Sequence, residues 1–418
     1  MKEVQKYEIM APAGSYESLA AAIRAGAGSV YFGIEGLNMR SRSANNFTID
    51  DLYRIAQICG KHHIHSYLTV NTIIYDSDAE AMHAIIDAAQ KAKISAVIAS
   101  DVAAMMYARS IGMKVHLSTQ VNITNTESLQ FYAQFADVVV LARELNLEQV
   151  KEIHRQIVER SIKGPSGQLV RLEMFCHGAL CMAVSGKCYL SLHEMNASAN
   201  RGACNQICRR SYTVKDKESN IELEIDNSCI MSPKDLKTIH FLNKILDAGV
   251  EVLKIEGRAR GPEYVKTVTE CYREAVQSYC AGTFSAEKIQ AWDKRLETVF
   301  NRGFWDGYYL GQRLGEWTHK YGNLATETKV YIGKAVKYFP RAGVAEFLME
   351  TQSLNAGDKV LITGPTTGAL YAEAEEIRVN LTPVKQTVKG EHFSMKTPEK
   401  VRPSDKLYKL IHRSANDY

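Results

Sequence analysis

The sequence has no long apolar run. None of its hydrophobic segments approaches the roughly 18 consecutive residues that a membrane-spanning helix requires. The N-terminal segment MKEVQKYEIMAPAGSYESL also lacks the apolar centre of a secretion signal. We therefore expect a cytoplasmic protein with no membrane partner, in a compartment that keeps thiols reduced. The nine cysteines are then metal ligands or core residues rather than disulfide partners.

Several catalytic motifs are absent as well. No G-x-G-x-x-G follows the first predicted strand, which disfavours a dinucleotide-binding sheet. The HEMNA segment at 193–197 lacks the second histidine of a zinc protease motif, and no G-x-S-x-G elbow of a serine hydrolase occurs. The sequence therefore gives no support to hydrolysis by either of these two routes.

The chain has little excess of either charge sign. The chain has 51 lysines and arginines against 47 aspartates and glutamates, a net charge of +4 that permits a basic patch without predicting a nucleic-acid partner. With 45% hydrophobic and 23% charged residues, the composition is that of a globular protein. A length of 418 residues favours two or three domains.

Short apolar runs alternate with helical segments through the first two thirds of the chain. Several are continuous rather than alternating, which is typical of parallel strands buried on both faces. This pattern predicts an α/β fold, a (β/α)8 TIM-like barrel, with an open doubly wound sheet as the competing fold. The predicted strands are YEIMAP (7–12), SVYFG (29–33), HSYLTVN (65–71), AVIAS (96–100), KVHLST (114–119), DVVVLAR (137–143), LVRLEMF (169–175) and EVLKIEG (251–257).

The alternation breaks between the seventh and eighth predicted strands. The insertion there, at about 176–235, contains closely spaced cysteines and leaves from the C-terminal mouth of the barrel, where loops build active sites. From residue 326 onward, short β segments separated by turn residues predict a small β-barrel-like domain. We therefore expect a barrel domain with an insertion at 1–325 and a C-terminal β domain at 326–418.

Four cysteines fall within the segments GALCMAVSGKCYLS and RGACNQICRR, spaced Cys181-x6-Cys188-x15-Cys204-x3-Cys208. Four thiolates can saturate a tetrahedral zinc ion, or each can bind one iron of a 4Fe–4S cluster. The first pair is too widely spaced for a typical zinc knuckle, and the neighbouring glycines let backbone amides approach inorganic sulfide. We predict a 4Fe–4S cluster, with zinc and buried core thiols as the alternatives.

The other cysteines have a simpler interpretation. Cys59, Cys271 and Cys280 each stand alone in a helical or turn context, which is typical of core thiols. Cys176 lies at the end of a predicted strand, where packing is the more natural role. Cys229, just before IMSPKDL, is a reserve ligand.

The segment EMFCHGALCMAVSGKCYLS resembles the signature of the collagenase-like U-32 peptidases. The segments NRGACNQICR, MSPKDL, LKIEGR and NRGF follow it in the order of that family, and APAG, HLSTQ and LARE precede it. The resemblance covers nearly the whole chain. Within the family, the chain is most similar to the bacterial tRNA hydroxylation proteins.

This resemblance implies a (β/α)8-like catalytic domain with a 4Fe–4S cluster on Cys181, Cys188, Cys204 and Cys208. It implies oxygen-independent hydroxylation of the tRNA wobble uridine at C5, with prephenate as the source of the hydroxyl group and tRNA as the partner. Related branches hydroxylate a ribosomal RNA cytidine or, as paired subunits, ubiquinone precursors, so a related subunit or a second copy is a further candidate partner. One branch takes its last ligand further downstream, which keeps Cys229 as an alternative to Cys208.

Cationic side chains at strand ends are candidates for binding the donor. In a barrel these ends meet at one mouth. A dicarboxylate such as prephenate needs fixed cations, and we expect Arg143 and Arg258 to clamp it, with Lys254 and Lys234 as further candidates.

Three titratable residues are candidates for proton transfer. His116 and His177 can carry protons, and Glu256 can act as a base or orient Arg258. Each also has a local explanation as a cap, an ion-pair partner or a side chain that fills the barrel. The other polar residues at strand ends are Asn71, Asp101, Ser118, Gln120, Glu144 and Glu173.

RNA binding requires basic surface and planar groups for stacking. Arg201, Arg209 and Arg210 surround the last two cysteines, and we expect them to contact RNA. The C-terminal domain adds scattered lysines with Tyr331, Tyr338 and Phe339, although most surface lysines are simply solvated.

Two other classes of function stay open. His177 lies four residues before Cys181, which allows a thiol hydrolase or collagenase-like peptidase. The other is a zinc-stabilised RNA-binding module without catalytic activity. The irregular cysteine spacing disfavours zinc, and the arginines expected at the barrel mouth have no purpose in a pure binding module.

Overall fold

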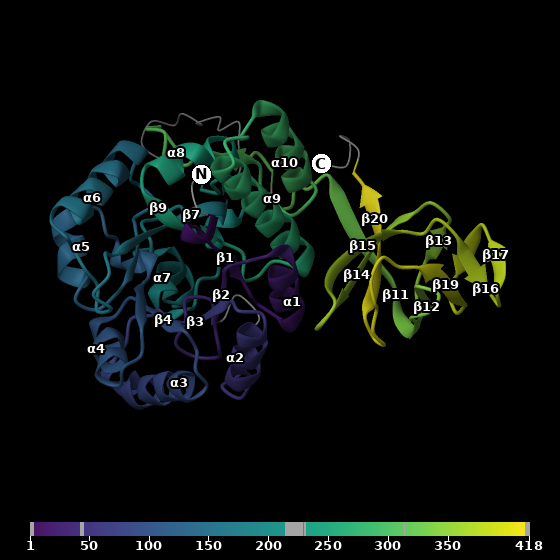
Figure 1. Ribbon diagram of the computed structural model, residues 1–418, viewed down its shortest axis with the longest axis horizontal. Helices are drawn as coiled ribbons and strands as arrows, with labels where there is room; N and C mark the ends of the chain where they lie inside the picture. The colour runs from purple at the N-terminus through teal and green to yellow at the C-terminus, as the bar shows by residue number, and fades with distance from the viewer. Residues whose placement is uncertain are drawn as a thin grey trace.

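The computed structural model describes residues 4–41, 46–213, 229, 231–312, 314–320 and 322–413. Eight parallel strands form a closed barrel, because the last of them pairs with both the first and the seventh (Figure 1). This confirms the predicted (β/α)8 architecture. The barrel strands are β1 (Glu8–Pro12), β2 (Ser29–Phe32), β3 (His65–Val70), β4 (Ala96–Ala99), β5 (Val115–Leu117), β6 (Val138–Val140), β7 (Arg171–Ala179) and β9 (Val250–Ile255).

Helices surround the barrel in the ring seen in Figure 1. Their polar caps match the sequence: the Ser15 side chain accepts a hydrogen bond from the Ser18 amide, and Asn146 forms a capping box with Gln149. No described helix is long and apolar enough to cross a membrane. The helices are α1 (Tyr16–Ala25), α2 (Asp51–Lys61), α3 (Ala79–Lys91), α4 (Val102–Ser110), α5 (Thr126–Tyr132), α6 (Leu147–Glu159), α8 (Leu242–Asp247), α9 (Pro262–Cys280) and α10 (Ala286–Glu297).

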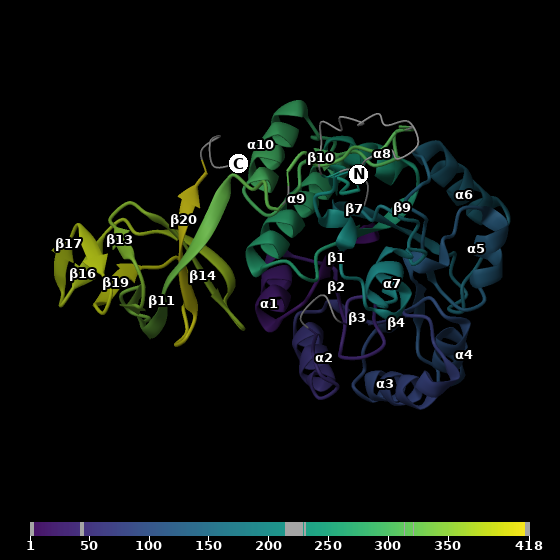
Figure 2. The same ribbon diagram turned by 180° about the vertical axis from the view of Figure 1, so that it is seen from behind.

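The seventh strand is longer than the sequence predicts. It continues past residue 175 to Ala179, because the insertion returns as β8 (Asp235–Lys237) and pairs antiparallel with residues 177–179. A short strand, β10 (Phe304–Trp305), then pairs parallel with β8. The described part of the intervening chain, which carries the four closely spaced cysteines and the short helix α7 (Leu190–Met195), lies over one end of the barrel, the end facing the viewer in Figure 2.

Short 3-10 turns connect these elements. Two of them, η4 (Ala199–Arg201) and η5 (Ile207–Arg209), shape the part of the insertion that carries the last two cysteines. The remaining turns are η1 (Val4–Lys6), η2 (Asp76–Asp78), η3 (Thr119–Val121) and η6 (Ile239–Phe241).

The chain from Glu327 onward forms antiparallel sheets. Eight strands follow the order β15-β14-β20-β11-β12-β19-β16-β17, and β13 pairs with β18. They enclose a separate apolar core, in which the rings of Phe347 and Phe393 stack 5.5 Å apart. The strands are β11 (Glu327–Phe339), β12 (Val344–Met349), β13 (Ser353–Asn355), β14 (Lys359–Gly364), β15 (Gly368–Glu373), β16 (Ile377–Val379), β17 (Thr382–Val384), β18 (Gln386–Val388), β19 (His392–Lys396) and β20 (Lys406–His412).

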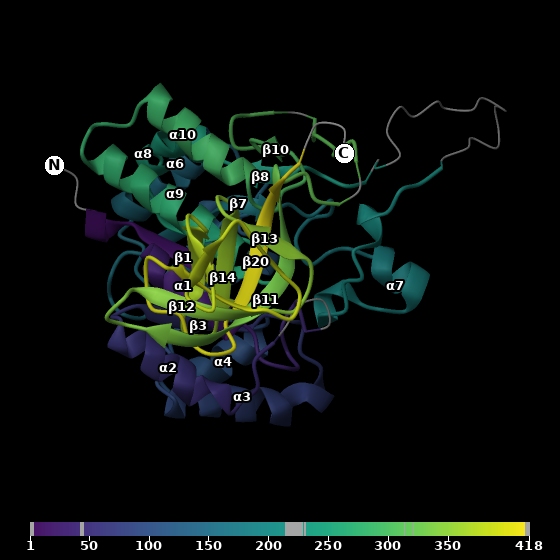
Figure 3. The same cartoon turned by 90° about the vertical axis from the view of Figure 1, so that its right-hand side faces the viewer.

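This C-terminal part packs against the side of the barrel domain, along α1 and α9 (Figures 1 and 3). Leu361 and Ala369 join the apolar core of the barrel domain. Gly368 approaches α1 so closely that a Cβ atom there would lie 2.8 Å from the backbone nitrogen of Ala21. Lys329 adds an ion pair with Glu263 of α9 at 2.8 Å. The contact is therefore close-packed, with backbone against backbone.

Candidate functional site

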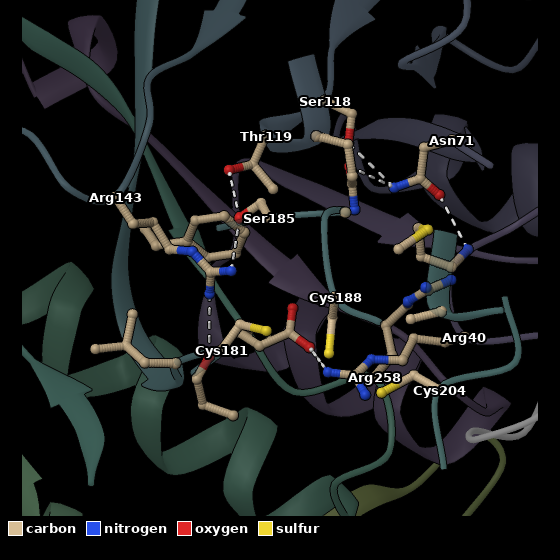
Figure 4. A pocket seen from close by; sticks show the side chains of 18 of the residues that line it. Arg40, Asn71, Ser118, Thr119, Arg143, Cys181, Ser185, Cys188, Cys204 and Arg258 are labelled. Carbon is tan, nitrogen blue, oxygen red and sulfur yellow. Dashed lines mark hydrogen bonds and ion pairs between the residues drawn. The ribbon is translucent and has the colours of Figure 1, made fainter. Parts of the chain in front are cut away.

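A cavity opens at the end of the barrel that the insertion covers (Figure 4). The ends of several barrel strands and the insertion contribute to its wall. Its charged lining residues are four arginines and one lysine against a single glutamate, so the space is strongly cationic. They are Arg40, Arg143, Arg209, Arg258, Lys254 and Glu256, and the cysteines on the wall are Cys181, Cys188, Cys204 and Cys208.

The four cysteines of the insertion differ from the other cysteines of the chain. Cys181 is exposed and Cys188, Cys204 and Cys208 are partly exposed, whereas the remaining five thiols, including Cys229, are buried. Burial raises the pKa of the Cys208 thiol, Arg209 opposes this rise, and the three other cavity cysteines add to it.

These thiols line one wall without closing around one point. In the described chain, no group of three or more His, Cys, Asp or Glu side chains has the arrangement that would hold a single metal ion. Cys229 is buried and does not line the cavity, whereas Cys208 does. The geometry therefore brings the four predicted ligands to one cavity and leaves the reserve ligand outside it.

One arginine ties the insertion together with hydrogen bonds, and two glycines let it approach the barrel mouth closely. Arg209 donates hydrogen bonds to the carbonyl oxygens of Leu180 and Pro233, which stand at the two ends of the insertion. Gly202 has a positive φ of 82°, and a Cβ there would lie 2.4 Å from the carbonyl oxygen of Asn38. Gly186, at φ 76°, similarly faces Gln120. Larger residues would push the cysteine-bearing loops away from the mouth.

Glu256 is the acidic residue of the cavity wall. Its Oε1 lies 3.1 Å from Nη2 of Arg40, and Tyr31 donates a hydrogen bond to Oε2 at 3.1 Å. Burial would raise the pKa of this carboxyl, but Arg40, Arg258 and Arg143 outweigh burial and lower it. The carboxylate is therefore ionised, and its direct cationic partner is Arg40 rather than the expected Arg258.

Arg258 and Arg143 are held in place by neutral partners. Nη1 of Arg258 donates to Asn38 Oδ1 and Thr69 Oγ1, both at 3.0 Å, in a buried position. Nη2 of Arg143 donates to Ser185 Oγ at 2.7 Å. Within the described residues neither guanidinium forms a salt bridge, so both can offer N–H donors and positive charge to an anion.

Lys254 lies deeper in the barrel. Its Nζ donates to Glu173 Oε1 at 2.8 Å, and the ammonium group lies 4.7 Å from the centre of the Tyr31 ring. Burial raises the pKa of the Glu173 carboxyl, although Lys254 opposes this rise. Glu173 Oε2 is buried without a hydrogen-bond partner among the described residues. The Lys254 ammonium group is thus paired with a carboxyl group of the protein and is less available to a ligand.

The two histidines do not line the cavity. His177 lies in β7, buried among the rings of Tyr264, Tyr272 and Phe304, and burial lowers its pKa to about 3. His116 is buried inside the barrel, 4.4 Å from the Tyr67 ring, and burial lowers its pKa to about 4. Both are therefore neutral at physiological pH, and neither lines the cavity of the four cysteines.

The remaining predicted contacts are scattered. Lys234 forms an ion pair with Glu316 at 2.6 Å and does not line the cavity. Arg201 pairs with Asp78, whereas Arg210 is exposed.

The three aromatic residues predicted in the C-terminal part have different surroundings. The Tyr331 hydroxyl binds Glu350, and Tyr338 packs against the second core. Phe339 is exposed, with Lys337 lying 5.2 Å from its ring centre. Of the three, Phe339 is therefore the most exposed.

Sequence reasoning missed Arg40 and the residues that hold the arginines. Arg40 lies in the loop after β2, and Asn38 in that loop is buried and contacts Arg258. Tyr31 and Thr69 point inward from β2 and β3. We listed polar residues that follow the C-terminal ends of strands as candidates. The same rule applied to the loop after β2 would have identified Arg40.

The comparisons with known proteins agree with this architecture. Residues 14–319 match the model of Peptidase family U32. The protein named Collagenase from Porphyromonas gingivalis strain W83 is 68% identical over 410 residues, covering 98% of this chain and 99% of that protein. The tRNA hydroxylation protein P1 of Bacillus subtilis strain 168 is 31% identical over 369 residues, covering 86% and 84%.

A ribosomal RNA enzyme is also similar. The 23S rRNA 5-hydroxycytidine C2501 synthase of Escherichia coli strain K12 is 31% identical over 318 residues, covering 74% of this chain and 46% of that protein. The barrel, the cysteine-bearing insertion and the family match all lie in the same part of the chain. The chain therefore belongs to peptidase family U32.

Proposed function

We propose that this protein hydroxylates an RNA base, with C5 of the tRNA wobble uridine as the target and prephenate as the source of the hydroxyl group, without molecular oxygen and in the cytoplasm. One observation carries the proposal: the four least buried cysteines of the chain share a cavity with four arginines. Two relatives whose names refer to tRNA hydroxylation and to a ribosomal 5-hydroxycytidine support an RNA substrate.

The donor set fits a 4Fe–4S cluster. Thiolates are soft ligands, and a cluster spreads its four ligands over four corners instead of gathering them around one ion. This suits four thiols that all line one cavity and are less buried than the other five cysteines. When bound by Cys181, Cys188, Cys204 and Cys208, such a cluster supplies electron transfer or a Lewis-acidic iron at the cavity wall.

The cationic wall suits a dicarboxylate donor. Arg143 and Arg258 present guanidinium groups that are fixed by neutral hydrogen-bond partners, and such groups bind carboxylates in a bidentate manner. Glu256 is ionised beside Arg40, so it orients that arginine and cannot donate a proton. Replacing C–H by C–OH on the base removes two electrons from it. Those electrons reduce the donor, whose C–OH becomes C–H.

Peptide hydrolysis is the second candidate, because the relative that is 68% identical is named Collagenase. A cysteine or serine nucleophile needs a base within hydrogen-bond reach. Among the described residues on the cavity wall there is no histidine. Two wall serines, Ser118 and Ser185, instead contact Asn71 and Arg143. These partners position the hydroxyl groups without activating them, so the cavity favours hydroxylation.

The proposal is tested by anaerobic purification followed by iron, sulfide and zinc analysis, together with mass spectrometry of RNA from a deletion strain. We expect about four irons and four sulfides per chain, and loss of 5-hydroxyuridine-type modification from tRNA in the deletion strain. Zinc in place of iron, or an unchanged pattern of RNA modification, would contradict the proposal.

A further inference from the structure

A second hollow lies beside the cysteine cavity and shares part of its wall. Arg143, Leu180 and Cys181 line both spaces. The two spaces are therefore neighbours. Of the eight other described residues on its wall, three are aromatic, and these rings have no role in the function proposed above. These rings belong to Trp305, Tyr308 and Trp317.

The three rings gather around a glycine. A Cβ atom on Gly315 would lie 3.3 Å from the Tyr308 hydroxyl, 3.7 Å from the Trp305 ring and 3.9 Å from the Trp317 ring. Trp305 is buried and fixed by a hydrogen bond from its Nε1 to the carbonyl oxygen of Lys234 at 3.1 Å. Its ring meets that of Tyr308 edge-on, with centroids 5.3 Å apart. Trp317 is 36% exposed, so part of its surface is open to a ligand.

We infer that this hollow binds the base of the nucleotide next to the target nucleotide, stacked against Trp317. The inference rests on the proposed function of the adjoining cavity. A base that leaves its strand to enter a catalytic pocket exposes the face of its neighbour. An aromatic ring covers that face, and it accepts any base because every base has a π-face.

Charge favours RNA over a peptide as the occupant. In the cavity on the other side of the shared wall, Lys254 and Arg40 are paired with carboxylates, whereas Arg143 and Arg258 are held by neutral partners. The phosphate that joins the two nucleotides would pass close to Arg143, which lies on the shared wall and forms no salt bridge among the described residues. The carboxylate of the hollow, Glu144, is exposed to solvent. An apolar peptide segment would gain nothing from these cations.

The test is a double-mutant cycle between protein and RNA. The anaerobically purified protein is titrated with a labelled anticodon stem–loop, and with stem–loops that are abasic at either neighbour of the wobble uridine. One of the two abasic stem–loops lacks the base that stacks on Trp317. We expect the wild-type protein to bind that stem–loop about tenfold more weakly than the intact one, a typical loss for one base–aromatic stack. Trp317→Ala should bind the intact RNA about tenfold more weakly and show no further loss with the abasic RNA.

Matched variants keep the test informative. Trp317→Phe retains a ring and should keep most of the affinity. Tyr53→Ala removes a ring that is 62% exposed on α2, outside both spaces, and should behave like the wild type. If Trp317→Ala fails to fold, Gly315→Ala takes its place in the test. It adds a methyl group among the three rings without removing a ring, and we expect it to weaken the binding of intact RNA.

The outcomes separate this inference from the proposed function. A wild type that binds no stem–loop would overturn both. A wild type that binds intact and abasic RNA equally would overturn the inference and leave the proposed function standing. An abasic penalty that persists in Trp317→Ala would also overturn it, since the ring would then contact something other than that base.

Discussion

Arg40 and Glu256 meet across the mouth of the barrel, with Nη2 of the arginine 3.1 Å from Oε1 of the glutamate. Arg40 comes from the loop after β2, and Glu256 follows β9 directly. The pair joins two strands that β1 separates, and it places an ionised carboxylate inside a ring of arginines. It thus fixes one side of the proposed anion site.

We expect Arg40→Ala to weaken donor binding and lower stability. The substitution removes one cation and leaves the partly buried Glu256 carboxylate without its direct partner, which typically costs about 1–3 kcal/mol. The KM for prephenate should rise by roughly tenfold with a smaller change in kcat, in anaerobic turnover assays. Arg40→Lys keeps the charge and should recover part of the affinity. An unchanged KM in both variants would remove Arg40 from the donor site.

The cysteines of the cavity should differ from the buried ones in metal content. Each of Cys181→Ala, Cys188→Ala, Cys204→Ala and Cys208→Ala is expected to retain far less than one cluster per chain, because each removes one corner ligand. Iron and sulfide analysis with a visible spectrum measures this.

Two matched variants serve as controls for the cluster. Cys59→Ala removes a buried thiol in α2, and Cys229→Ser alters a buried thiol outside the cavity wall. Both should keep their iron. Loss of iron in Cys229→Ser with retention in Cys208→Ala would reassign the fourth ligand.

His177 should make stability depend on pH. Burial lowers its pKa from 6.5 to about 3, so between these values the unfolded chain binds a proton that the folded protein does not. Stability is therefore complete above pH 6.5 and falls as the pH decreases, by up to about 1.4 kcal/mol per pH unit for one group. Urea unfolding between pH 7 and pH 5 measures the slope.

The variant His177→Phe keeps a ring among Tyr264, Tyr272 and Phe304 but cannot be protonated. It should show a shallower loss of stability on acidification, with the remaining slope coming partly from His116. RNA hydroxylation per folded molecule should change little. A drop of a hundredfold or more in activity would instead assign His177 a direct part in proton transfer.

Gly368 should control the attachment of the C-terminal sheets. Gly368→Val adds a side chain that meets the backbone of α1 at a positive φ of 70°, and we expect a loss of about 1–3 kcal/mol and faster proteolysis between the two parts. Gly390→Val is the matched control, since Gly390 also has a positive φ but faces open space. Equal behaviour of the two variants would mean that backbone strain, not the interface, determines the effect.

The barrel was predictable because its strands are local features. The run VVV at 138–140 and the alanine-rich strand at 96–99 are apolar on both faces, which marks them as buried parallel strands without any knowledge of their partners. The end of β7 was not predictable in the same way. Its last residues are held by β8, whose pairing residues come from Asp235 onward, and such a contact leaves no periodic signal.

The grouping of the four cysteines at one cavity was predictable, because they lie close together in a glycine-rich insertion at the barrel mouth. The cations were harder to assign, because the residue type gives the charge but not its partner. Lys234 is neutralised by Glu316, and Arg201 by Asp78, each through contacts between distant segments. His177 was expected near the thiols from its position in the chain, yet the extended β7 turns it toward Tyr272 on α9.

Arg143 belongs to both hollows at the barrel mouth. If Arg143 contacts a ligand in each hollow, it cannot shift toward one ligand without changing its contact with the other. By thermodynamic reciprocity, any factor by which a base in the aromatic hollow changes the affinity for an anion in the cavity is also the factor by which that anion changes the affinity for the base. The affinity for the small co-substrate would then depend on whether the RNA strand occupies the aromatic hollow, and the affinity for the RNA strand would depend on the co-substrate.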